Sequence, residues 1–368
     1  MENNNQVDKE FSLNIDNIED SEGENSNKIM WFSFVVLILA LIAIAVFVFK
    51  YYEKYAIVKE ITDPNQELLV EDDLSLKKKL PVEMKGKIYL TLAPKNDENN
   101  SVGLYSYNLK KEKLEEALLI EGKQFRGGEV FHTGNRILTT DGEDVFINDM
   151  ADLNSQGIVF DDDIYNIKSE PVWSIGGWYT FYSAMNDLSL DINIPESWKI
   201  YSVHNDGTQK YLVDGVHPHI SKDNYIVFLK NNGLYGMDLD GSNEIKIWEI
   251  EGEARTSIQL DVSHLSNLAI LSNPFEASVY ILKFKIAEGE NFFEGETIKE
   301  IKTYGFQPTL SPDDKYLAII EASLEKTEEY IYVRPKLVVY DLETYKRYEL
   351  MDLKDYRPEE ILINDWWI

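Results

Sequence analysis

The feature that most constrains this chain is a repeat with a period of between 40 and 50 residues. Its clearest unit, Phe306–Leu350, begins FQPTLSPDDKYLAII and ends, after a charged insertion, in KLVVYDLETYKRYEL. A proline and, three residues later, a serine lead into a polar turn, which an apolar run follows. The same lead-in recurs upstream in HPHISKDNYIVFL, with Pro218 and Ser221 in the equivalent places. Such a period is typical of β-propellers.

We call the serine of this lead-in the lead-in serine. The position recurs at intervals of 42 to 49 residues, at Ser311, Ser263, Ser221 and Ser174 and more weakly at His132 and Glu83. The residues three places earlier are Pro308, Leu260, Pro218 and Pro171. A proline suits a strand position where the missing N–H is harmless. The spacing predicts six units between residues 81 and 368.

Each unit contains the apolar and alternating segments that four short strands require. An apolar run such as KYLAII or YIVFLK is typical of a strand that is buried on both faces. A more alternating segment follows, such as KLVVYDL or GLYGMDL, and most units add a final strand such as YKRYEL. The fold class predicted is all-β: a six-bladed β-propeller of four-stranded antiparallel blades.

Two predicted hairpin turns carry Gly207 and Gly241, in Asn-Asp-Gly-Thr and Asp-Gly-Ser-Asn. Glycine supplies the positive φ of a tight hairpin. With these turns the repeat resembles the TolB-like propeller family, whose units have a Pro-x-Trp-Ser-Pro-Asp-Gly lead-in and an Ile-Tyr…Asp-Gly-Thr hairpin. The matching segments are Pro171-Val-Trp173-Ser174, Pro308-Thr-Leu-Ser311-Pro312-Asp313 and Ile200-Tyr201…Asp206-Gly207-Thr208. The first two units and the fifth depart from this lead-in. The resemblance implies a fold but no catalytic residues.

The propeller is predicted to follow three segments of different composition. Residues 1–28 are rich in Asn, Glu, Asp and Ser, which predicts a disordered acidic tail. Residues 29–50 contain the uncharged run Ile29–Phe49, long enough to cross about 30 Å of hydrocarbon, and are predicted to form one retained transmembrane helix. Residues 51–80 are predicted to be a linker, and residues 81–368 the propeller domain.

The orientation of this predicted single-pass protein is set by two opposing considerations. Lys50, Lys54 and Lys59 follow the span while only Lys28 closely precedes it, which favours a cytoplasmic carboxyl end. The resemblance implies the reverse, because anchored propellers of this kind usually work outside the inner membrane. We expect the propeller domain to lie outside the cytoplasm, in the cell envelope.

The composition excludes several kinds of chemistry. The chain has no cysteine, so disulfides, thiolate zinc sites and thiol nucleophiles are absent. Its net charge is −29, which argues against binding to a phosphate backbone, so nucleic acid is not an expected partner. The Gly-x-Ser-x-Gly elbow of a serine hydrolase is also missing.

Three groups of residues have spacings that metal sites also use. His217 and His219 would leave the same face of a strand, although two polar residues at a blade entrance are the favoured interpretation. Asp238, Asp240, Ser242 and Glu244 resemble the start of a calcium loop, but a hairpin turn is favoured there. Asp161–Asp163 are interpreted as a solvated loop. We therefore predict no catalytic residue, no metal site and no cofactor.

The sequence favours a non-enzymatic, membrane-anchored propeller that binds a protein or peptide partner or acts as a scaffold in the cell envelope. The alternative is a propeller-type enzyme, a hydrolase or lyase, with carboxylates in the central channel. A sensor that signals through the acidic tail ranks last.

The closure of the ring can also be predicted. The first unit has a weak lead-in, while the chain ends in an isolated strand-like segment, Ile361–Ile368. We expect this segment to supply the missing strand of the first blade and to bury Trp366 or Trp367 against Ile88 and Leu90.

Overall fold

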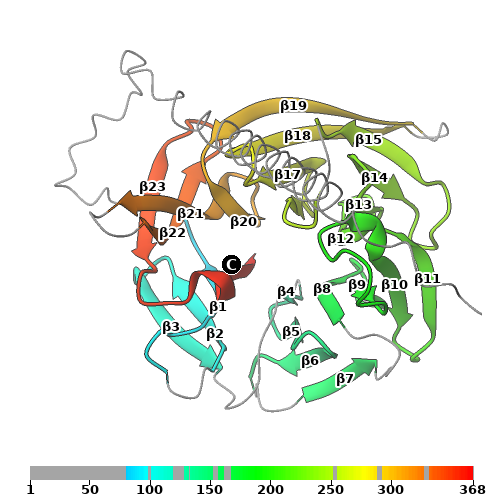
Figure 1. Ribbon diagram of the computed structural model, residues 1–368, viewed down its shortest axis with the longest axis horizontal. Helices are drawn as coiled ribbons and strands as arrows, with labels where there is room; N and C mark the ends of the chain where they lie inside the picture. The colour runs from blue at the N-terminus through cyan, green and yellow to red at the C-terminus, as the bar shows by residue number, and fades with distance from the viewer. Residues whose placement is uncertain are drawn as a thin grey trace, which may run out of the picture. The chain divides into compact units, whose positions relative to one another are not determined.

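The computed structural model describes residues 80–97, 101–118, 128–131, 133–151, 156–160, 167–251, 255–287, 292–326 and 331–367. They form six four-stranded sheets arranged as blades around a central axis (Figure 1). All strand pairings are antiparallel. The prediction of an all-β, six-bladed propeller is confirmed.

Within each blade the strands follow one another from the channel outward. Blade 1 contains β24 (Leu362–Trp367), β1 (Lys87–Leu92), β2 (Gly103–Asn108) and β3 (Lys113–Leu118), and blade 2 contains β4 (Gly128–Val130), β5 (Arg136–Thr140), β6 (Val145–Asp149) and β7 (Gln156–Phe160). Blade 3 contains β8 (Ile167–Trp173), β9 (Tyr179–Met185), β10 (Lys199–His204) and β11 (Gln209–Asp214), and blade 4 contains β12 (Val216–Ile220), β13 (Ile226–Lys230), β14 (Gly233–Met237) and β15 (Ile245–Glu249). Blade 5 contains β16 (Gln259–Val262), β17 (Leu268–Asn273), β18 (Ser278–Ala287) and β19 (Phe292–Lys302), and blade 6 contains β20 (Gly305–Leu310), β21 (Tyr316–Lys326), β22 (Ile331–Asp341) and β23 (Arg347–Asp352). Two short 3-10 helices, η1 (Pro195–Ser197) and η2 (Pro358–Glu360), lie in connections.

The inner strands contact one another in the order β24, β4, β8, β12, β16, β20 and back to β24, which closes the ring. No helix within the described ranges has the length and apolar character needed to cross a membrane. The predictions made for residues 1–79, the transmembrane helix of residues 29–50 among them, lie outside the described residues.

Burial follows the sequence pattern from the channel outward. The second strands are the apolar runs, and they are buried on both faces because neighbouring blades cover them: in β13, Ile226 through Leu229 are fully buried. The outer strands alternate or are open to solvent, as in β11, where Tyr211 is 47% exposed. The core therefore lies between blades rather than at one centre.

The lead-in serines are buried and stabilise the turn between the first and second strands. Ser311 Oγ accepts the N–H of Tyr316 (2.9 Å), and Ser174 Oγ accepts the N–H of Tyr179 (3.0 Å). The third residue after the serine has a positive φ in three of the blades: Gly177 (67°), Asn224 (64°) and Asp314 (56°). Gly, Asn and Asp tolerate this conformation best, which accounts for the polar composition of the turn.

The structure corrects the two weak lead-in assignments. In blade 2 the backbone N–H of Phe131 bonds to the carbonyl of Arg136, as that of Ser174 bonds to Tyr179, so Phe131 rather than His132 holds the position of the serine. Glu83 lies in a turn before β1. The lead-in of blade 1 is instead β24, where Trp367 pairs with Lys87, the first residue of β1.

The lead-in prolines lie inside the inner strands, each at an irregularity in strand pairing. The register shifts around Pro171 in β8, around Pro218 in β12 and around Pro308 in β20, whereas β16, with Leu260 at this position, pairs without a shift. The missing proline N–H is tolerated because the bulge interrupts the ladder.

The predicted closure is confirmed. β24 pairs antiparallel with β1 and becomes the innermost strand of blade 1. Trp366 is 3% exposed and packs in one cluster with Ile88 and Leu90. Trp367 packs on the other side of the strand, against a cluster that includes Val130 of blade 2.

The turn between β14 and β15 provides a first prediction. Gly241 has φ +85°, and a Cβ built on it would meet Leu212 Cδ2 at 3.2 Å. We expect Gly241→Val to lower the free energy of unfolding by about 1–3 kcal/mol, because valine is strained in the left-handed region. Gly207→Val is the matched control: φ is +86°, but no atom lies within 4 Å of the added Cβ, so its loss should be smaller. Chemical denaturation measures both, and an unchanged Gly241→Val protein would contradict the hairpin assignment.

Candidate functional site

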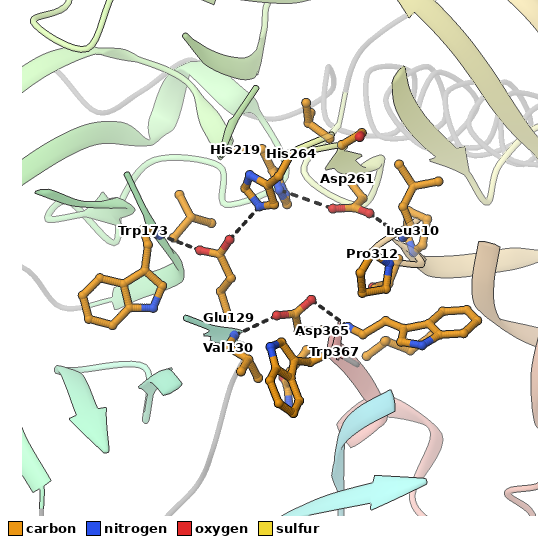
Figure 2. Close-up of a pocket in the computed structure, with 18 of the residues that line it drawn as sticks. Glu129, Val130, Trp173, His219, Asp261, His264, Leu310, Pro312, Asp365 and Trp367 are labelled. Carbon is orange, nitrogen blue, oxygen red and sulfur yellow. Dashed lines mark hydrogen bonds and ion pairs between the residues drawn. The ribbon is translucent and has the colours of Figure 1, made fainter. Parts of the chain in front are cut away.

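A cavity of about 630 Å³ occupies the centre of the ring. All six inner strands line it, so it is the central channel of the propeller (Figure 2). In every blade the residue two places before the lead-in serine or its structural equivalent lines the channel. These six residues are Glu129, Val172, His219, Asp261, Thr309 and Asp365.

The three carboxylates on the inner strands each accept a backbone N–H from the next blade. Asp365 Oδ2 accepts the N–H of Val130 (2.8 Å) and Glu129 Oε2 that of Trp173 (2.5 Å). Asp261 Oδ2 accepts the N–H of Leu310 (2.6 Å). The inner edge of a sheet carries unpaired N–H groups. At each of three blade junctions, one of these carboxylates accepts one such N–H group.

The remaining carboxylate oxygens also have partners. Asp365 Oδ1 accepts the N–H of Trp366 (2.6 Å), and Asp261 Oδ1 lies 3.6 Å from His219 Nδ1. Glu129 Oε1 lies 2.9 Å from Nε2 of His264, a residue of the turn after β16. All three carboxylates are therefore bonded to backbone N–H groups, and Glu129 and Asp261 also lie beside an imidazole.

The pKa values of these groups are shifted in opposite directions. Burial opposes protonation of His264, but the hydrogen bond and the negative charge of Glu129 outweigh it and raise the His264 pKa to about 9. Burial lowers the pKa of His219 to about 3, and the nearby His217 and His264 add to this. Burial raises the pKa of Asp261 to about 6 and that of Asp365 well above its ordinary range, where Glu129 also raises it. Near neutral pH, His264 is charged and His219 is neutral.

The predicted pair of His217 and His219 does not share a face. The bulge at Pro218 interrupts the alternation, and His217 has φ +56°. His219 lines the channel, whereas His217 Nε2 donates to the carbonyl of Thr256 (2.7 Å). Among the residues that the structure describes, no group of three or more His, Asp or Glu side chains is placed to hold a metal ion.

The calcium-like segment is a hairpin turn. Ser242 N–H donates to Asp240 Oδ1 (2.8 Å), Asn243 Nδ2 donates to Asp238 Oδ2 (2.6 Å), and Glu244 pairs with Lys230 (2.7 Å). Its oxygens are thus used within the hairpin and its neighbouring strand. Asp161–Asp163 lie outside the described residues.

The sequence interpretation did not select Glu129, Asp261, His264 or Asp365. The signal was present for Asp261, which precedes the lead-in serine Ser263 by two residues, a spacing that puts it on the channel side of its strand. For Glu129 and Asp365 the lead-in had been misplaced, at His132 and Glu83, so the spacing could not find them. His264 directly follows the lead-in serine Ser263.

The pKa of His264 provides a second prediction. Because its pKa in the folded protein lies above the ordinary 6.5, the pairing with Glu129 contributes stability that is fully present below pH 6.5 and is lost as the pH rises through about 9. Glu129→Gln should return the His264 pKa towards its ordinary value, and the stability difference from wild type should be largest below pH 6.5. An NMR titration of the His264 ring and denaturation at several pH values measure these effects. An unchanged His264 pKa in the variant would contradict the assignment.

The mouth of the channel carries apolar side chains beside charged ones. The turns that follow the inner strands contribute Ile175, Leu265 and Pro312 to the lining, and Ile175 and Leu265 are 42% and 61% exposed. The channel therefore combines charged walls with exposed aliphatic side chains at its entrance.

Comparison with known proteins agrees with this architecture. No protein-family model and no curated protein matches the chain. Among solved structures, the putative TolB from Agrobacterium tumefaciens matches at 12% identity and a TM-score of 0.51, over 73% of this chain and 89% of the other. TolB from Acinetobacter baumannii matches at 14% and 0.51, over 76% of this chain and 66% of the other. A chain of the nidogen/laminin complex matches at 14% and 0.53, over 76% and 98%. At these identities the likeness concerns the fold, and the described chain has the fold of the TolB-like six-bladed propellers.

Proposed function

We propose that this protein is a non-enzymatic propeller that binds a protein or peptide partner through its central channel. In the same proposal, residues 29–50 anchor it in a membrane and the propeller lies outside the cytoplasm, in the cell envelope. The observation that carries the binding role is the channel itself: a cavity of about 630 Å³ with charged walls and exposed aliphatic side chains at its mouth. That volume is within the range of about 300–1,000 Å³ in which ligands are commonly bound.

The bonding of the channel carboxylates favours binding over catalysis. A general acid or base must reach a proton on the substrate. Each of Glu129, Asp261 and Asp365 already accepts a backbone N–H from the neighbouring blade. These side chains hold adjacent blades together, and moving them to serve a substrate would leave those N–H groups unsatisfied.

The aliphatic side chains at the mouth and the net charge of the protein indicate what kind of partner would bind. Exposed aliphatic side chains around a cavity are typical of protein-binding surfaces. The net charge of −29 favours a partner with a basic contact surface, because opposite charges steer association. The nidogen/laminin structure is that of a protein complex, and its likeness in fold supports a protein partner for this propeller.

Affinity capture with the full-length protein in detergent tests the binding role. A specific partner should be recovered by the wild type and lost in the double variant Ile175→Glu, Leu265→Glu, which places charge in the mouth. Leu188→Glu is the matched control: Leu188 is 63% exposed in the connection at the other end of β9. Equal recovery by all three proteins, or no specific recovery by any, would overturn the proposal.

The alternative of a propeller-type hydrolase or lyase is favoured by a different observation. Asp261, with a pKa raised to about 6 by burial, and His264, with a pKa of about 9, face one channel. Groups whose pKa values are displaced in this way are frequent in acid–base sites. Turnover of an oligosaccharide or lactone panel that disappears in Asp261→Asn would establish the enzyme and displace the binding proposal.

A further inference from the structure

We propose that the ion pair between His264 and Glu129 closes the channel in the free protein, and that a basic side chain of the partner opens it by taking the place of His264 on Glu129. This inference rests on the proposed binding function and concerns how the same site is regulated. We call the pair the cross-channel ion pair.

The geometry makes the pair a bridge across the ring. Glu129 lies in β4 of blade 2, and His264 follows β16 of blade 5. In the ring order these blades are three apart, so they face each other across the channel (Figure 2). Nε2 of His264 lies 2.9 Å from Oε1 of Glu129 although the residues are 135 apart in sequence. A chain that entered through the mouth would meet this bridge.

The two ends of the bridge differ in exposure and support. The Glu129 side chain is 15% exposed and its second oxygen accepts the N–H of Trp173. The His264 side chain is 52% exposed, and within the described chain its imidazole is hydrogen-bonded to Glu129 alone. The histidine is therefore the end that can swing away, while Glu129 stays in place.

The carboxylate of Glu129, the fixed end of the bridge, determines which ligand can displace His264. Leaving a largely buried carboxylate without its cation costs free energy, whereas exchanging that cation for another one avoids the cost. A group that displaces His264 must therefore bring a positive charge to Glu129. A lysine or arginine side chain meets this requirement, and the acidic protein would attract it.

The other titratable groups of the channel act on the same position. Asp261 of β16 and Asp365 of β24 both favour a cation at His264, whereas His219 of β12 faces Asp261. His217, also in β12, is bound to the Thr256 carbonyl and lies outside the cavity lining. Asp314 of the turn after β20 lines the cavity and accepts hydrogen bonds from Ser263 and Ser266. Once the imidazole leaves, a second cation at this position would therefore lie among carboxylates.

Thiol labelling tests closure without any partner. The natural chain has no cysteine, so Thr309→Cys places a single thiol in the channel, at a residue of β20 that is 6% exposed. Adding His264→Asn should raise the rate of labelling by a maleimide about tenfold or more, the population change expected from losing a charged hydrogen bond. His204→Asn is the matched control: this imidazole pairs with Asp206, outside the cavity lining. Equal rates in the three proteins would overturn the closing role.

An NMR titration tests the exchange of cations. Tetralysine added to the full-length protein should lower the His264 pKa towards its ordinary value, because His264 loses Glu129, whereas tetraglutamate should leave it unchanged. An unchanged His264 pKa at saturating tetralysine would overturn the exchange. Neither experiment uses the natural partner, so their failure is distinct from failure of the affinity capture.

Discussion

Deletion of Ile361–Ile368 is expected to abolish folding of the propeller. The deletion removes β24, the innermost strand of blade 1, which pairs with β1 and contacts the inner strands β20 and β4. Ile361, Ile363 and Trp366 are buried, and each such side chain contributes about 1.5–3 kcal/mol. Their sum is comparable to the whole stability of a typical domain, about 5–15 kcal/mol.

Circular dichroism and solubility of the truncated protein measure this effect. Deletion of Met1–Asp8, in the predicted acidic tail, removes the same number of residues and serves as the control, with no expected change in melting temperature. A protein without Ile361–Ile368 that stays soluble and melts with the full-length chain would show that β24 does not close the ring.

Trp366→Ala is expected to have the largest effect of any single substitution in the closing strand, with a loss of about 3–5 kcal/mol. The indole is 3% exposed, donates from Nε1 to the Lys85 carbonyl (2.9 Å) and stacks near Tyr316 of blade 6 with ring centroids 6.2 Å apart. Alanine would leave a cavity between the first and last blades.

Two companion variants separate the contributions to that loss. Trp366→Phe keeps an aromatic ring but leaves the Lys85 carbonyl without its donor, so the loss should be smaller, about 1–3 kcal/mol. Trp367→Ala should also cost less, because Trp367 is only partly buried. Denaturant unfolding measures all three, and a Trp366→Ala loss no greater than that of Trp367→Ala would contradict the packing described.

The sequence predicted best those blades whose turn contains a serine that accepts backbone N–H groups. Ser174, Ser221 and Ser311 each satisfy backbone N–H groups of the turn with Oγ, so the repeat has a physical cause and could be recognised. In blade 2 a phenylalanine replaces the serine, and the prediction placed the lead-in one residue too late. The closure was predictable because the first unit has only a weak lead-in and the strand-like segment Ile361–Ile368 has no unit of its own, so the segment can complete the first blade.

The channel could be predicted only in part. The positions two residues before the lead-in serine follow from strand alternation, and they include Asp261 and His219. That Glu129 meets His264 depends on two blades being opposite in a closed ring, which no local pattern encodes. The bulges at the prolines likewise arise from pairing between strands, so the shared face predicted for His217 and His219 was wrong.

The closing strand also determines how the domain responds to mechanical force. β24 and β1 are antiparallel, and the pair Lys87–Trp367 lies where the chain enters β1 and leaves β24. Tension applied to the two ends of the domain would therefore load these strands in a peeling geometry, in which the hydrogen bonds break one after another rather than together. A domain pulled at its two ends would therefore be expected to open first at blade 1.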